Sequence, residues 1–315
     1  MANKRVTIIG AGAIGLAWAI VFAQAKYQVS VFDVDESQRS QFKEKVRRRL
    51  ELLKEHQLLD SDVDVLLNLI TIYSRIEEAC LDSEFIQECG PESLELKQDL
   101  FHNLESIAHV NIIFASSSSA IKPSLISEKM LRPERFLVVH PANPPYLLPV
   151  VEIVPSAKTS EIVVEKTTEF LISLNMVPIL VYGEPEGFVF NRLQGAVLRE
   201  AYCLVRDGVI SPLDLDKVMT NGLGRRWSVI GPFATSALNV KGGLVAHAKR
   251  MADSYFRMGK ERGQNDLWSD ELVNKVSLSI ESKWKNEDWD KNVLRRDIAL
   301  MELMKNVKEN PDLNL

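Results

Sequence analysis

Residues 6–15 read Val-Thr-Ile-Ile-Gly-Ala-Gly-Ala-Ile-Gly, an apolar run that passes into the pattern Gly-x-Gly-x-x-Gly. The β-branched residues before the first glycine predict a buried strand, and the apolar pattern after it predicts a helix. Gly10 permits the tight turn, Gly12 leaves the backbone open to a pyrophosphate, and Gly15 lets the helix pack on the strand. Unpaired N–H groups at the helix start then face the phosphates. The expected dinucleotide-binding residues of this turn are Gly10, Gly12, Ala13, Ile14 and Gly15.

A second predicted strand, residues 28–32, ends in Asp33, which lies 18 residues after Gly15. An acidic side chain in this place accepts hydrogen bonds from the adenine ribose of a dinucleotide. The same carboxylate repels the 2′-phosphate of NADP, and residues 34–36 contain no arginine to offset it. The sequence therefore favours NAD as the cofactor. The alternative is that Asp33 is only a turn residue that closes the strand.

The N-terminal stretch also has some features of a secretory signal. Lys4 and Arg5 precede the apolar run, and Ala23-Gln24-Ala25 resembles a small-residue cleavage site. Three glycines in phosphate-loop spacing, followed by a strand that ends in Asp33, favour the dinucleotide-binding interpretation instead.

Composition places the chain among ordinary globular proteins of about two domains. It has 315 residues, of which 46% are hydrophobic and 26% charged, and no apolar run reaches the roughly 18 residues of a membrane span. The net charge of −5 gives no reason to expect nucleic-acid binding. Cys80, Cys89 and Cys203 are an odd number without metal-ligand spacing, which indicates buried thiols in a reducing cytoplasm and no metal site.

Strand and helix patterns alternate along the first part of the chain. Further strands are expected at 70–73, 83–89, 110–115, 136–139, 150–154 and 177–181, and helices at 36–56, 61–69, 92–107 and 161–174. This alternation predicts an α/β fold with a Rossmann-type, doubly wound, mostly parallel sheet over residues 1–186. After Gly183-Glu184-Pro185-Glu186-Gly187 the pattern is almost wholly helical, so residues 187–315 are expected to form an all-α domain that also makes a dimer interface.

A basic cluster lies within the predicted helix at 36–56, and it consists of Lys43, Lys45, Arg47, Arg48 and Arg49. Such a run is usually a solvated helix face. The functional alternative is a contact with a phosphorylated substrate tail, such as that of coenzyme A.

Outside the glycine turn, the candidate catalytic residues are a histidine, a glutamate and a group of serines. His140 follows a short predicted strand, in a loop stiffened by prolines. Glu152 lies alone in an apolar strand, where a carboxylate is costly unless it is paired, and His140 is a sensible partner. A structural histidine with an unrelated glutamate is the alternative. The four serines at 116–119 follow a buried strand, where ligands bind in a parallel sheet or where a loop simply caps a helix.

Four segments together resemble the 3-hydroxyacyl-CoA dehydrogenase superfamily across essentially the whole chain, and within it the L-gulonate 3-dehydrogenase (lambda-crystallin) branch. They are Ile-Gln-Glu-Cys at 86–89 with Pro91-Glu92 and Leu-Glu-Leu-Lys at 94–97, His-Pro-Ala-Asn-Pro-Pro at 140–145, Gly-Phe-Val-Phe-Asn-Arg-Leu-Gln at 187–194, and Gly222-Leu223-Gly224 through Ile-Gly-Pro-Phe at 230–233.

The resemblance implies a role for each matching position. Ser119, which lies 21 residues before His140, matches the active-site serine, and His140 matches the general acid/base. Glu152 matches its carboxylate partner, and Asn191 matches the asparagine at the domain junction. The further positions expected on the cofactor are Glu92, Lys97, Ser117 and Asn143. The resemblance also implies a homodimer formed through the helical domain.

One segment departs from the coenzyme A members, because Arg225-Arg226-Trp227 precedes the Gly-Pro-Phe motif. We expect Arg226 to hold a substrate carboxylate, with Ser119 and Asn191 on the reacting oxygen; the alternative for the arginines is a surface or dimer contact. The expected activity is NAD-dependent oxidation of the 3-hydroxyl of a small hydroxy acid. The alternatives are a 3-hydroxyacyl-CoA dehydrogenase, a carnitine dehydrogenase, or a crystallin-like protein that binds NADH without turnover.

Overall fold

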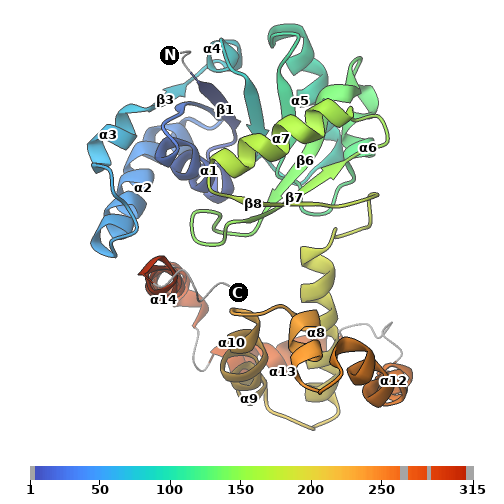
Figure 1. Cartoon of the computed structure of the whole chain (residues 1–315). Helices are drawn as coiled ribbons and strands as arrows, with labels where there is room; N and C mark the ends of the chain where they lie inside the picture. The colour runs from blue at the N-terminus through green and yellow to red at the C-terminus, as the bar shows by residue number, and fades with distance from the viewer. Residues whose placement is uncertain (1–3, 263–268, 282–284, 310–315) are drawn as a thin grey trace. The chain divides into compact units, whose positions relative to one another are not determined.

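The computed structural model describes residues 4–262, 269–281 and 285–309. By its internal contacts the chain divides into two compact units, Met1–Arg192 and Leu193–Leu315. The first unit is an α/β domain and the second is helical, as the sequence predicted (Figure 1). The boundary expected between residues 186 and 187 lies shortly before this division and stays a prediction.

The first unit is built on one eight-stranded sheet in the order β3-β2-β1-β4-β5-β6-β7-β8. All neighbouring strands are parallel except β6 and β7, which are antiparallel. The strands are β1 (Arg5–Ile9), β2 (Gln28–Phe32), β3 (Ile70–Tyr73), β4 (Phe85–Glu88), β5 (Ile113–Ser116), β6 (Phe136–Pro141), β7 (Val150–Pro155) and β8 (Val177–Leu180).

Helices connect these strands and flank the sheet (Figure 1). They are α1 (Ala13–Gln24), α2 (Glu36–Glu55), α3 (Val63–Asn68), α4 (Ile76–Cys80), α5 (Leu94–Ile107), α6 (Pro123–Ile126) and α7 (Glu161–Ser173), with 3₁₀ turns η1 (Ser127–Lys129) and η2 (Pro133–Arg135). The core is apolar, and within it Phe101 contacts Phe114 and Phe136 edge to face, at centroid distances of 5.9 and 4.7 Å.

The strand order reverses at β1, which has β2 on one side and β4 on the other. Ligands of open α/β sheets bind at such a reversal, beyond the carboxyl ends of the strands. Because β1, β2, β4, β5 and β6 run parallel, the residues that follow them gather at one edge of the sheet. We call this edge the carboxyl edge.

Several predicted strands have different limits in the structure, and the differences are clearest for two of them. The strand expected over 110–115 begins only at Ile113, where it pairs with Phe85 of β4, while Val110 is exposed. The strand expected to end at Val139 continues through His140 and Pro141, because both pair with β7. Pairing with neighbouring strands sets these limits, and the local sequence pattern does not specify that pairing.

The second unit is formed by helices. Its elements are α9 (Pro212–Val218), a π-helical turn η3 (Met219–Leu223), α10 (Gly224–Trp227), α11 (Pro232–Leu238), α12 (Gly243–Arg262), α13 (Asp270–Glu281), a 3₁₀ turn η4 (Asn286–Asp288) and α14 (Trp289–Glu309), together with most of α8 (Phe190–Arg206). In the part of the chain that the structure describes, no helix is long and apolar enough to cross a membrane.

Candidate active site

The glycine turn joins β1 to α1 at the carboxyl edge. Gly10 has φ +105°, and a Cβ there would lie 2.7 Å from the Cys89 carbonyl group. A Cβ on Gly15 would lie 1.9 Å from the Gly10 oxygen, so the start of α1 packs directly against the turn. Around Gly12, by contrast, no described atom lies within 4 Å of the Cβ position. Two of the glycines are therefore required by packing, and the third faces open space.

This open space fits the pyrophosphate of NAD. Gly12 is the N-cap of α1, and no side chain caps the N–H groups of the first turn, which includes Ala13 and Ile14. No acidic residue lies in that turn to repel an anion. An uncapped helix start beside a glycine without neighbours is the arrangement that binds phosphate.

Asp33 follows β2 and connects the second strand to the glycine turn. Its Oδ2 accepts a hydrogen bond from the Ala11 N–H at 2.7 Å, and its Oδ1 accepts one from the Asp35 N–H at 2.9 Å. Arg39, one turn into α2, donates from Nη1 to the carbonyl oxygens of Asp33 and Val34 at 2.7 and 3.0 Å. Sequence reasoning missed Arg39, although its place one helical turn after the N-cap Asp35 was a signal.

His140 and Glu152 face each other on β6 and β7 as a direct cross-strand pair. His140 Nδ1 lies 2.8 Å from Glu152 Oε2, and the two side chains are 10% and 5% exposed. The other carboxylate oxygen, Oε1, accepts the N–H groups of Val189 and Phe190 at 2.7 and 2.9 Å. The structure thus brings together the two residues that the sequence paired.

The protonation of this pair follows from its contacts. Burial acts to raise the pKa of Glu152, but the hydrogen bonds from His140, Phe190 and Val189 outweigh it and hold that pKa below its usual range. Glu152 is therefore a carboxylate at neutral pH and must accept a proton from Nδ1. When the imidazole carries one proton, that proton is therefore on Nδ1, and Nε2 is the nitrogen available as a base.

Glu92 holds the serine loop that follows β5. Its Oε1 accepts three hydrogen bonds, from Ser118 Oγ at 2.7 Å and from the Ser119 and Ala120 N–H groups at 3.0 and 3.1 Å. Asn191 Nδ2 donates to the Ser119 carbonyl oxygen at 3.1 Å. The backbone of Ser119 is fixed on both sides, and its hydroxyl has no hydrogen-bond partner among the described residues.

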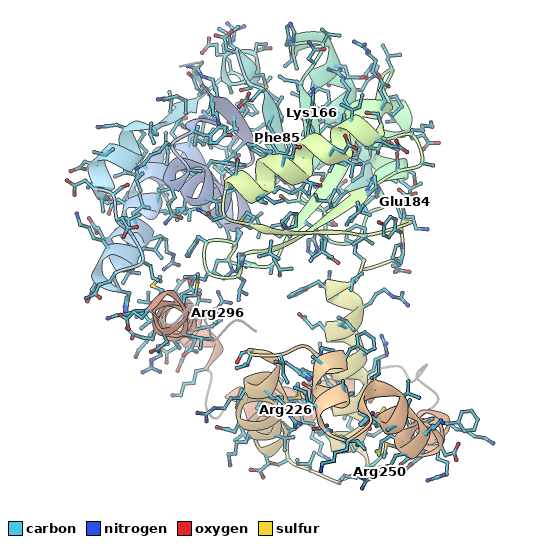
Figure 2. The ribbon with its side chains drawn as sticks, in the orientation of Figure 1. Phe85, Lys166, Glu184, Arg226, Arg250 and Arg296 are labelled. Carbon is cyan, nitrogen blue, oxygen red and sulfur yellow. The ribbon has the colours of Figure 1, made fainter. Side chains whose placement is uncertain are left out.

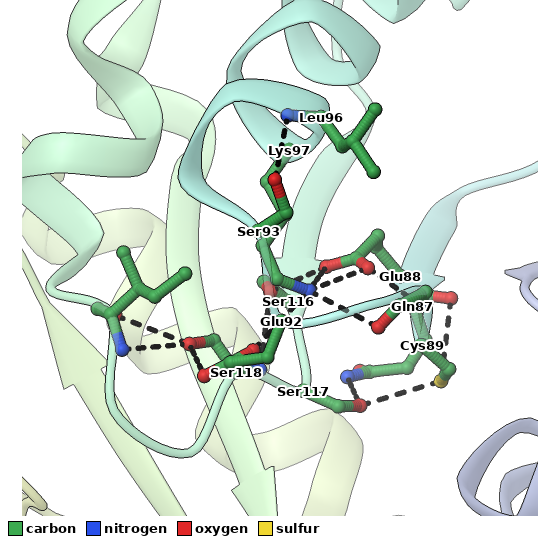
Figure 3. Close-up of polar contacts among 12 residues, drawn as sticks. Gln87, Glu88, Cys89, Glu92, Ser93, Leu96, Lys97, Ser116, Ser117 and Ser118 are labelled. Carbon is green, nitrogen blue, oxygen red and sulfur yellow. Dashed lines mark hydrogen bonds and ion pairs between the residues drawn. The ribbon is translucent and has the colours of Figure 1, made fainter.

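Behind this loop lies a buried ion pair between Glu88 and Lys97 (Figure 3). Lys97 Nζ is 2.7 and 2.8 Å from the two Glu88 oxygens and 3.6 Å from Glu92 Oε2. Ser116 Oγ and the Gly90 N–H also donate to Glu88, each at 2.6 Å. The ammonium group is thus enclosed, with the Lys97 side chain 3% exposed, and the cofactor contact expected for Lys97 stays a prediction.

Glu88 was not singled out from the sequence. The available signal resembles the one that identified Glu152, a carboxylate within a largely apolar strand, where burial demands donors. The expected strand 83–89 contains two glutamates, and in the structure Glu84 is exposed whereas Glu88 is buried.

The remaining expected residues have different surroundings. Ser117 lies beside Gln87 and Cys89 at the end of β4, and Asn143 is exposed in the loop after β6. Arg226 belongs to the second unit, where α10 carries it as an exposed residue (Figure 2). Its role toward the substrate stays a prediction.

Comparisons with known proteins identify the family of the chain. The family model of the 3-hydroxyacyl-CoA dehydrogenase NAD binding domain matches residues 5–184, and that of the C-terminal domain matches residues 187–283. The fold and the matches define the protein as an NAD-dependent dehydrogenase acting on a CH–OH group. The chain belongs to the 3-hydroxyacyl-CoA dehydrogenase family.

Several relatives and solved structures are similar over nearly their whole length. A lambda-crystallin homolog of Rattus norvegicus is 36% identical over 304 residues, 95% of each chain. An L-carnitine dehydrogenase of Oceanobacillus iheyensis is 31% identical, over 97% of this chain and 99% of its own. The solved structure of an NAD⁺-dependent 5-formyl-3-hydroxy-2-methylpyridine 4-carboxylic acid 5-dehydrogenase has the same fold, with a TM-score of 0.83, 24% identity, and coverage of 98% and 99%.

The glycine turn generates a prediction with a matched pair of variants. Gly15→Ala places a methyl group against the Gly10 oxygen, so it should destabilise the protein by about 3 kcal/mol. Gly12→Ala meets no described neighbour, so it should fold normally but bind NAD⁺ poorly. Thermal melting and calorimetric titration with NAD⁺ measure the two effects. Equal melting temperatures for Gly15→Ala and wild type would contradict the packing argument.

Proposed function

We propose that the protein oxidises the 3-hydroxyl of a small free hydroxy acid, as an L-gulonate 3-dehydrogenase does. The observation that carries this proposal is the buried His140–Glu152 pair, which lies at the same carboxyl edge as the NAD-binding turn. Similarity to lambda-crystallin homologues supports the choice of substrate class. We place the enzyme in the cytoplasm, since its cysteines form no disulfide pattern.

His140 is the general base of this proposal. Oxidation of a secondary alcohol releases a hydroxyl proton, and the unprotonated Nε2 of His140 accepts it. The imidazolium that results lies against the Glu152 carboxylate, 2.8 Å from Nδ1, which stabilises the positive charge. NAD⁺, when bound by the glycine turn and Asp33, supplies the hydride acceptor.

Glu152 also fixes the orientation of the His140 imidazole ring. Two backbone N–H groups at the start of α8 hold Oε1, so the carboxylate cannot rotate away from His140. Phe188 and Phe190 pack near the imidazole, at centroid distances of 5.8 and 6.5 Å. These contacts limit the ring to one tautomer and one orientation before substrate arrives.

Ser119 is the proposed donor to the substrate oxygen. Glu92 and Asn191 hold its backbone from both sides, and its hydroxyl is not used by any described residue. Asn191 would then have two effects. It holds the backbone of Ser119 in place, and its amide can also donate a hydrogen bond to the substrate oxygen. A fixed donor near the base orients the carbinol carbon for hydride transfer.

The basic cluster of α2 favours the free acid over a coenzyme A ester. Arg47 lies 2.8 Å from Asp64, and Arg48 lies 3.0 Å from Glu44 on the same helix. Lys45 donates to Gln38. Arg47 and Arg48 are thus ion-paired on the surface, which is typical of a solvated helix face and leaves these two cations less available to a phosphorylated tail.

Arg226 is the proposed carboxylate anchor. It follows a π-helical turn, and a Cβ on Gly224 would lie 2.9 Å from the Met219 oxygen, so the turn requires glycine just before the arginine pair. Helix irregularities of this type occur frequently at functional sites. A guanidinium binds a carboxylate through two parallel hydrogen bonds, which suits a small acid that must be held by its own charge.

The activity is tested by NAD⁺ reduction with L-gulonate, L-3-hydroxybutyrate, L-carnitine and 3-hydroxybutyryl-CoA. We expect turnover with a free hydroxy acid and a loss of about 10²–10⁴-fold in His140→Ala, because general-base assistance disappears. Glu152→Gln should also lose turnover, because its amide does not stabilise the imidazolium. Stopped-flow or steady-state absorbance at the NADH band measures the rates.

NADH binding to the same variants is the control, since neither residue belongs to the glycine turn. His140→Ala within a few-fold of wild-type turnover would refute the assignment of the base. Tight NADH binding without turnover on any of the four substrates would favour a crystallin-like binding protein.

The carboxylate anchor is tested by substrate charge. Arg226→Met should raise KM for the free acid by a factor that corresponds to about 1.5–3 kcal/mol, the value of a charged hydrogen bond. The methyl ester of the acid lacks the charge and should respond little. Arg225→Met is the matched control. If both variants change acid and ester alike, the arginines have a surface or interface role instead.

We further propose that two copies associate through the helical unit. On α12, Leu244, Val245, Tyr255 and Phe256 are all exposed, and residues 245, 252 and 256 lie on one face by their spacing. Apolar helix faces of this kind are usually buried against a partner. The resemblance to a homodimeric family supports a second copy as that partner.

The proposed interface is tested by placing a glutamate on either of two faces of α12. Phe256→Glu puts a carboxylate into the proposed contact, so the protein should become a monomer in light scattering at micromolar concentration. Arg250→Glu changes the polar face of α12 (Figure 2) and should leave the oligomeric state unchanged. A dimer that persists in Phe256→Glu would exclude this face.

A further inference from the structure

A hydrogen-bonded group at the ends of β4 and β5 has no part in the proton transfer described above. It contains Gln87 of β4, Cys89 and Ser117, which Figure 3 shows, together with Trp18 of α1. Ser117 is its centre, because it contacts all three of the others. Gln87 and Trp18 are completely buried, whereas Ser117 is partly exposed. The group therefore extends from the interior to the surface of the carboxyl edge.

The orientation of the Gln87 amide is determined by its neighbours. Nε2 lies 3.2 Å from the carbonyl oxygen of Val139, which can only accept, so this atom must be the nitrogen. The second proton of the amide points to Ser117 Oγ at 2.7 Å. Oε1 has no partner among the described residues, so the side chain acts here as a donor only.

The Ser117 hydroxyl is consequently a donor with a defined direction. Its oxygen accepts Gln87 Nε2–H and also Trp18 Nε1–H at 3.2 Å, and a hydroxyl oxygen has two lone pairs. With both used, the proton cannot turn toward either nitrogen. Among the described residues its remaining partner is Cys89 Sγ, at 3.4 Å.

Cys89 is a poor acceptor for this proton. Desolvation raises the pKa of its thiol to about 12, so the sulfur stays neutral at physiological pH. Neutral sulfur accepts hydrogen bonds weakly. A ligand oxygen that approached Ser117 would replace the thiol at little cost.

The position of Ser117 indicates which part of the cofactor it meets. Asp33 follows β2, on one side of the strand-order reversal, and is placed for the adenine ribose. Ser117 follows β5, on the other side, where the second mononucleotide-binding half of the sheet lies. The nicotinamide nucleotide belongs to that half.

We propose that Ser117 donates its hydroxyl proton to the carboxamide oxygen of the nicotinamide ring, and that Gln87 and Trp18 are positioning residues that direct this donor. The contact orients the ring, since a fixed carboxamide determines which ring face is turned toward the substrate. This inference depends on NAD binding by the family and not on the identity of the hydroxy acid.

The experiment compares ligands that differ only at the carboxamide. Dissociation constants of NAD⁺ and thionicotinamide adenine dinucleotide are measured by calorimetry for wild type and Ser117→Ala. The sulfur analogue is a weaker acceptor, so wild type should bind NAD⁺ about fivefold more tightly, as expected for one neutral hydrogen bond. Ser117→Ala should lose this preference.

ADP-ribose, which lacks the nicotinamide, separates recognition from structural damage. Its affinity should be equal in wild type and Ser117→Ala, and Cys89→Ala, which removes the weak competing acceptor, should keep the preference for NAD⁺. If Ser117→Ala weakens ADP-ribose as much as NAD⁺, Ser117 is only a structural link, and the proposal is wrong. Equal wild-type affinities for the two dinucleotides would overturn it without any variant, whereas no binding of NAD⁺ at all would instead contradict the dehydrogenase function.

Discussion

A carboxylate taken out of water has to be met by hydrogen-bond donors, and Glu152 is the carboxylate on which the proposed catalytic edge depends. One of its oxygens is bound by His140 across the β6–β7 ladder, and the other by two N–H groups at the start of α8. Leaving a buried polar group without its hydrogen-bond partner costs about 1–3 kcal/mol, and more when the group is charged. The same contacts that satisfy the charge also set the tautomer of the imidazole, so stability and reactivity have a common source.

The same constraint recurs behind the serine loop. Glu88 is satisfied by Lys97, Ser116 and Gly90, and Lys97 in turn lies near Glu92. Glu92 then binds the loop backbone through one oxygen. A chain of contacts therefore connects the buried Glu88–Lys97 ion pair, through Glu92, to the backbone of Ser119.

The two halves of the carboxyl edge are held in different ways. On the adenine side, backbone amides bind Asp33, and the glycine turn is fixed by the close approach of Gly10 to Cys89. On the other side, the fixing groups are side chains such as Gln87 and Trp18, which direct the Ser117 hydroxyl. The backbone contacts fix the position at which a phosphate can bind. The side-chain contacts fix the direction of a hydroxyl donor, which can then distinguish one chemical group of the cofactor from another.

The sequence by itself determined the fold class, the glycine turn, the acidic end of β2 and the pairing of His140 with Glu152. The first three follow from local rules, namely strand periodicity and the spacing of the glycines and the acidic residue. The pairing rests on the cost of a lone charge in an apolar strand and on the family resemblance. Only the tertiary structure decided that Lys97 is enclosed by carboxylates, that Arg39 reaches the carbonyl of Asp33, and that Gln87 and Trp18 both donate to the Ser117 hydroxyl. The physical reason is that periodicity reveals whether a side chain is buried, while hydrogen-bond partners come from strands and loops far apart in the chain. A donor's direction is known only when every neighbouring donor and acceptor has been counted in three dimensions.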